Sequence, residues 1–116
     1  MAFVLTTKQV KGSGFCAQLT GDISGTETAV AAVASKSHYI TSITIFTATV
    51  NTFTVQDNTA VTPVVIFGPF TTAATYTGGA YRITFDKPIM VAAGKQIDVT
   101  ASAADTFCLV IQGTTE

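Results

Sequence analysis

Short runs in which apolar residues alternate with polar residues recur along most of this chain, and turn-forming residues separate them. One run places Ile43 and Ile45 between Ser42 and Thr44. Alternation with a period of two sends successive side chains to opposite faces of a β-strand. The β-branched and aromatic residues that fill these runs suit a pleated surface. The pattern predicts an all-β fold.

The turn signals divide the chain into about eight strands, which predicts an antiparallel β-sandwich of the jelly-roll-like kind. In residues 27–34 the alanines also suit a helix, but the surroundings favour a strand. Only a few residues separate the runs 38–47 and 51–56, so we expect a hairpin there. We expect Gly68-Pro69 and Pro88 to end strands. The candidate ranges are 15–20, 27–34, 38–47, 51–56, 63–67, 80–86 followed by 89–91, 95–100 and 106–112.

The length of 116 residues fits one domain. Residues 1–14 are predicted to form an N-terminal arm or an added strand, because Gly12-Ser13-Gly14 interrupts the chain there. Residues 15–116 are predicted to form a single β-sandwich domain.

Charged residues make up 11% of the chain, whereas about 25% is usual. So little charge leaves much of the surface to other groups, and the chain offers 22 threonines as one covering. The nearest approach to a basic cluster is Lys8 with Lys11, which gives no footprint for nucleic acid. No apolar run reaches the roughly 20 residues that span a bilayer, and the start lacks the features of a signal peptide. We therefore expect synthesis in a cytosol-like compartment and no nucleic-acid or membrane partner.

Two predicted strands look apolar on both faces. The first is residues 63–67, and the second is residues 106–112, where Cys108 and Val110 lie opposite the inward set. Monomers rarely leave large apolar surfaces bare. The arm could cover one such face and a neighbouring subunit the other, so we expect a homo-oligomer.

Cys16 and Cys108 are the only cysteines, and His38 is the only histidine. The cysteines read either as reduced thiols that pack like small hydrophobic residues, which we favour, or as one bridge between the first and last strands. A lone histidine is more often a surface or structural residue than a metal ligand or general base.

The remaining polar residues single out no catalytic or metal site, and no cofactor is expected. The acidic residues fit turns, strand ends and surface positions better than a catalytic pair. Tyr76, in a threonine-rich loop, is the only plausible free aromatic, because alternation points Tyr81 toward the core. The acidic residues are Asp22, Glu27, Asp57, Asp86, Asp98, Asp105 and Glu116.

Residues 39–113 resemble a pattern found in virion proteins of tailed bacteriophages. The stretches that carry the resemblance are Ile43-Thr44-Ile45-Phe46-Thr47-Ala48, Val65-Ile66-Phe67-Gly68-Pro69-Phe70, Ile89-Met90-Val91-Ala92-Ala93-Gly94-Lys95, Ile97-Asp98-Val99-Thr100 and Val110-Ile111-Gln112-Gly113. Together they are similar to the small jelly-roll or β-sandwich decoration (cement) proteins of phage capsids.

The resemblance implies a structural virion protein without an active site or a cofactor. Such proteins sit on the capsid surface, bind the major capsid protein, often as trimers, and stabilise the head. The sequence leaves two alternatives open. One is another structural part of the virion, such as a tail or fibre domain. The other is a carbohydrate-binding β-sandwich module. An enzyme is not expected, because the residues assemble no acid/base constellation.

Overall fold

The computed structural model describes residues 4–9, 14–21, 25–47, 50–72, 81–102 and 107–116. Within these ranges the chain forms nine strands and no helix, and no segment there could cross a membrane as a helix. The strands are β1 (Val4–Gln9), β2 (Gly14–Gly21), β3 (Gly25–Val30), β4 (His38–Thr47), β5 (Thr52–Gln56), β6 (Val65–Thr71), β7 (Tyr81–Met90), β8 (Ile97–Ala101) and β9 (Phe107–Thr115).

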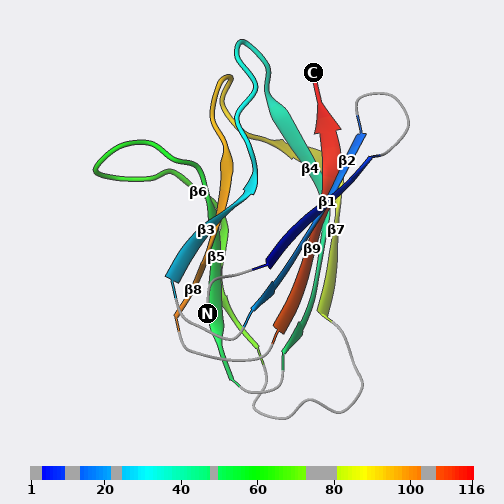
Figure 1. The fold of residues 1–116 in the computed structure, drawn as a ribbon, viewed down its shortest axis with the longest axis vertical. Helices are drawn as coiled ribbons and strands as arrows, with labels where there is room; N and C mark the ends of the chain where they lie inside the picture. Colours follow the sequence, from blue (N-terminus) through cyan, green and yellow to red (C-terminus); the bar gives the residue numbers. More distant parts are fainter. Residues whose placement is uncertain (1–3, 10–13, 22–24, 48–49, 73–80, 103–106) are drawn as a thin grey trace.

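The strands form two antiparallel sheets that pack face to face (Figure 1). The five-stranded sheet has the order β1-β2-β9-β4-β7, and the four-stranded sheet has the order β3-β8-β5-β6. The predicted all-β antiparallel sandwich is therefore confirmed.

The pairing is nested along the sequence. Strand β5 pairs with β6, β4 with β7, β3 with β8 and β2 with β9. The chain from β2 to β9 is thus one long hairpin that wraps around a common core, which is the jelly-roll arrangement. Strand β1 adds to the outer side of β2, with Val4 opposite Thr20 and Gln9 opposite Phe15.

The expected hairpin between residues 38–47 and 51–56 is wrong. Strand β4 pairs with β7 and β9, whereas β5 pairs with β6 and β8, so these two strands lie in different sheets. A short separation in sequence permits a hairpin but equally permits a crossing between the two layers. The local hairpin forms instead between β5 and β6, the next strand along the chain, whereas β4 pairs with the distant strands β7 and β9.

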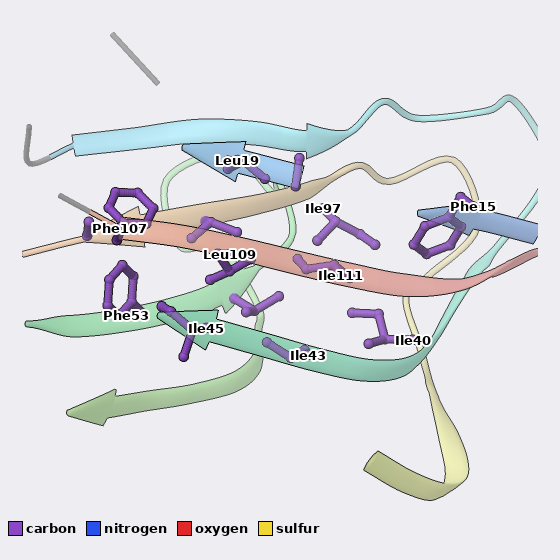
Figure 2. Packing of buried hydrophobic residues seen from close by; sticks show 14 of the residues in the cluster. Phe15, Leu19, Ile40, Ile43, Ile45, Phe53, Ile97, Phe107, Leu109 and Ile111 are labelled. Carbon is purple, nitrogen blue, oxygen red and sulfur yellow. The ribbon is translucent and has the colours of Figure 1, made fainter. Parts of the chain in front are cut away.

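The core lies between the sheets, where the inward residues of both layers meet (Figure 2). Phe53 of β5 is its largest fully buried side chain. The Phe53 ring lies 5.1 Å from that of Phe107 and 5.8 Å from that of Phe70, between ring centroids. The buried cluster comprises Phe15, Leu19, Ala29, Ile40, Ile43, Ile45, Phe53, Val55, Val91, Ile97, Val99, Ala101, Phe107, Leu109 and Ile111.

Two strands continue through the prolines that were expected to end them. Strand β6 runs through Gly68-Pro69, and β7 runs through Pro88. Proline removes a backbone N–H, so it is tolerated where one side of a strand has no ladder partner. Both β6 and β7 are edge strands, and the register of each against its neighbour shifts close to its proline.

The two strands expected to be covered on both faces differ in the structure. In β9, Cys108 and Val110 are half-buried by neighbours in the same sheet, since β9 lies between β2 and β4. In β6, Val65 is exposed. The β1 segment of the arm lies beside β2 in the plane of the sheet and does not cover the outer face of β9.

Candidate interaction surface

His38 is a structural residue inside the sandwich. It is fully buried, and its Nε2 lies 2.9 Å from the carbonyl oxygen of Ala31. A carbonyl oxygen only accepts, so Nε2 carries a proton and donates it. The other ring nitrogen, Nδ1, lies 2.8 Å from the hydroxyl oxygen of Thr115. Both nitrogens are therefore engaged within the protein, and the ring joins β4, β9 and the segment that follows β3.

The acidic residues are spread over the molecule. Asp98 of β8 accepts a hydrogen bond of 2.7 Å from Nε2 of Gln96, and the Glu116 carboxylate accepts one from the Thr114 hydroxyl. Among the described residues no three His, Cys, Asp or Glu side chains come together in a way that could hold a metal ion. Glu27 and Asp86 are exposed on edge strands, and Asp22 and Asp105 lie outside the described residues.

The two cysteines are free thiols in half-buried positions. Cys16 lies opposite Gln112, whereas Cys108 lies opposite Thr20. The cysteines are thus displaced by four residues along paired strands, which is about 13 Å and too far for a disulfide. Burial raises the pKa of the Cys108 thiol, which lowers its reactivity as a nucleophile.

The two tyrosines singled out from the sequence have different outcomes. Tyr81 lies opposite Ile45, a core residue, so alternation assigned its face correctly. The side chain is nevertheless 44% exposed, so Tyr81 is not buried in the core as the sequence predicted. The reason is its position at the start of an edge strand, where the sheet has no neighbour on one side. Tyr76 lies outside the described residues.

The outer face of the four-stranded sheet is lined by hydroxyl groups that bond to each other. The hydroxyls of Thr26 and Thr100 lie 2.9 Å apart, and those of Thr52 and Thr71 also lie 2.9 Å apart. Gln96 bonds to the Thr28 hydroxyl in the same area. Cross-strand hydroxyl pairs stabilise a sheet and keep its surface polar without charge. This face explains how part of a chain with so few charges remains hydrated.

Exposed apolar residues gather instead where β5 passes into β6. The loop of residues 57–64 stands away from the sandwich in Figure 1. Val61 in this loop is fully exposed, with a relative accessibility of 103%, and Val64 and Val65 are 56% and 50% exposed. We refer to Val61, Val64 and Val65 as the valine surface. Sequence alternation did not reveal it, because residues 63–67 read as a buried strand.

Asp57 fixes the base of this loop. Its carboxylate Oδ1 accepts hydrogen bonds from the backbone N–H groups of Thr59, at 2.9 Å, and Val64, at 2.8 Å. The backbone N–H of Asp57 donates in turn to the carbonyl oxygen of Val64, at 2.9 Å. Burial alone would raise the pKa of Asp57, but these backbone bonds, the Thr59 hydroxyl and the nearby charge of Lys95 together hold it below its usual range. The turn role that the sequence assigned to Asp57 agrees with this geometry.

The loop also holds Val61 in a conformation that valine rarely adopts. Its φ is 70°, and the backbone N–H of Thr62 donates to the carbonyl oxygen of Ala60 across it, at 2.8 Å. A hydrogen bond over one residue with positive φ is a γ-turn of the strained form. A residue held in this backbone conformation lowers the stability of the fold by on the order of 1–3 kcal/mol. Because a fully exposed side chain recovers none of this cost within the monomer, Val61 is a candidate for contact with a partner.

Acidification is expected to loosen the loop through Asp57. Its pKa is held below the ordinary value of 3.8 in the folded protein, so its carboxylate stabilises the fold at neutral pH and loses that effect as the pH falls below about 4. We expect Asp57→Asn, which cannot titrate, to show a smaller loss of stability between pH 7 and pH 3 than the unmodified chain. Urea unfolding at both pH values measures the difference.

A second variant tests the hydrogen bonds separately from the charge. Asp57→Ala leaves two backbone donors without their acceptor, so it should cost about 1–3 kcal/mol at pH 7, whereas Asp57→Asn keeps an acceptor oxygen and should cost less. Equal pH dependence of Asp57→Asn and the unmodified chain would show that the carboxylate does not control this loop.

A scan of protein-family models found no match to the chain, and searches of the curated proteins and of the solved structures found no similar protein.

Proposed function

We propose that this chain is a structural virion protein that decorates the capsid and stabilises the phage head by contact with the major capsid protein and with copies of itself. The observation that supports this most is the valine surface, on a chain in which only 11% of residues are charged. A loop that a buried carboxylate fixes in place, and that presents a strained and exposed valine, is suited to contact and not to catalysis.

The jelly-roll arrangement is compatible with this role, because such sandwiches are common among viral capsid domains. A fold of this kind serves many functions, so the fold alone carries little weight. The resemblance of residues 39–113 to phage decoration proteins supplies the specific location, the capsid surface, and a trimer as the associated stoichiometry.

Labelling of intact particles tests the proposal. An antibody raised against the purified chain, coupled to gold, would be applied to phage particles from a culture that carries the gene and viewed by electron microscopy. We expect gold on the capsid. Gold confined to the tail would replace decoration by a tail or fibre role, and unlabelled particles, with the chain found only in the soluble fraction, would overturn the virion proposal.

A further inference from the structure

We draw no further inference here: the strongest candidate, the valine surface where β5 passes into β6, is exposed, but nothing in the structure shows what covers it.

Discussion

Replacing Gly113 with alanine is expected to lower the free energy of unfolding by more than about 3 kcal/mol, or to prevent folding. Gly113 lies in the central strand β9, opposite Ile40 of β4. A Cβ atom at Gly113 would overlap the carbonyl oxygen of Tyr39 and would come within 2.8 Å of the Phe15 ring. The backbone oxygen cannot move away without breaking the β4–β9 ladder, so the overlap cannot be relieved locally.

Gly94→Ala is the matched control, because it makes the same chemical change where the added atom meets nothing within 4 Å. Gly94 has a φ of 76°, so alanine there should cost only about 1–2 kcal/mol of backbone strain. Urea unfolding of both variants gives the comparison. A Gly113→Ala protein as stable as Gly94→Ala would mean that β4 and β9 are not packed as tightly as this register requires.

Replacing Phe53 with alanine is expected to cost about 3–5 kcal/mol, a large share of the stability of a domain of this size. The ring is fully buried between Phe107 of the first sheet and Phe70 of β6. Its removal leaves a cavity at the junction of both sheets and loosens the attachment of β6 to the core. Thermal melting followed by circular dichroism, with urea titration, measures the loss.

Phe53→Leu keeps most of the buried volume and should cost about 1.5 kcal/mol or less. A loss of stability that is much larger for Phe53→Ala than for Phe53→Leu therefore shows that the volume of the Phe53 side chain is needed to fill its site. A loss below about 1 kcal/mol for Phe53→Ala would contradict the packing of this part of the core.

The inward side chains of the core could be read from the sequence before any partner strand was known. Ile43, Phe53, Ile97 and Leu109 each stand in an alternating run, and each is buried. Alternation depends only on the geometry of a single strand, in which neighbouring side chains point to opposite faces. Local sequence therefore carried the fold class and most of the core without knowledge of the strand order.

The candidate interaction surface was much less predictable. The apolar run 63–67 does not state whether its strand lies at the centre of a sheet or at an edge, and in the structure Val65 is exposed on β6, which pairs on one side only. The anchoring of the loop also depends on a contact between Asp57 and Val64, which becomes possible only when the chain turns back on itself.

By itself, then, the sequence determined an all-β sandwich and the inward faces of its strands. It also showed that charged groups are too few to cover the surface, so that uncharged groups such as threonine hydroxyls must cover much of it. The tertiary structure decided which strands are edges, why Pro69 and Pro88 do not interrupt theirs, and where Val61 is exposed. The physical reason is that side-chain alternation is a property of one strand. Whether a strand is an edge depends instead on whether another strand pairs with each of its two sides.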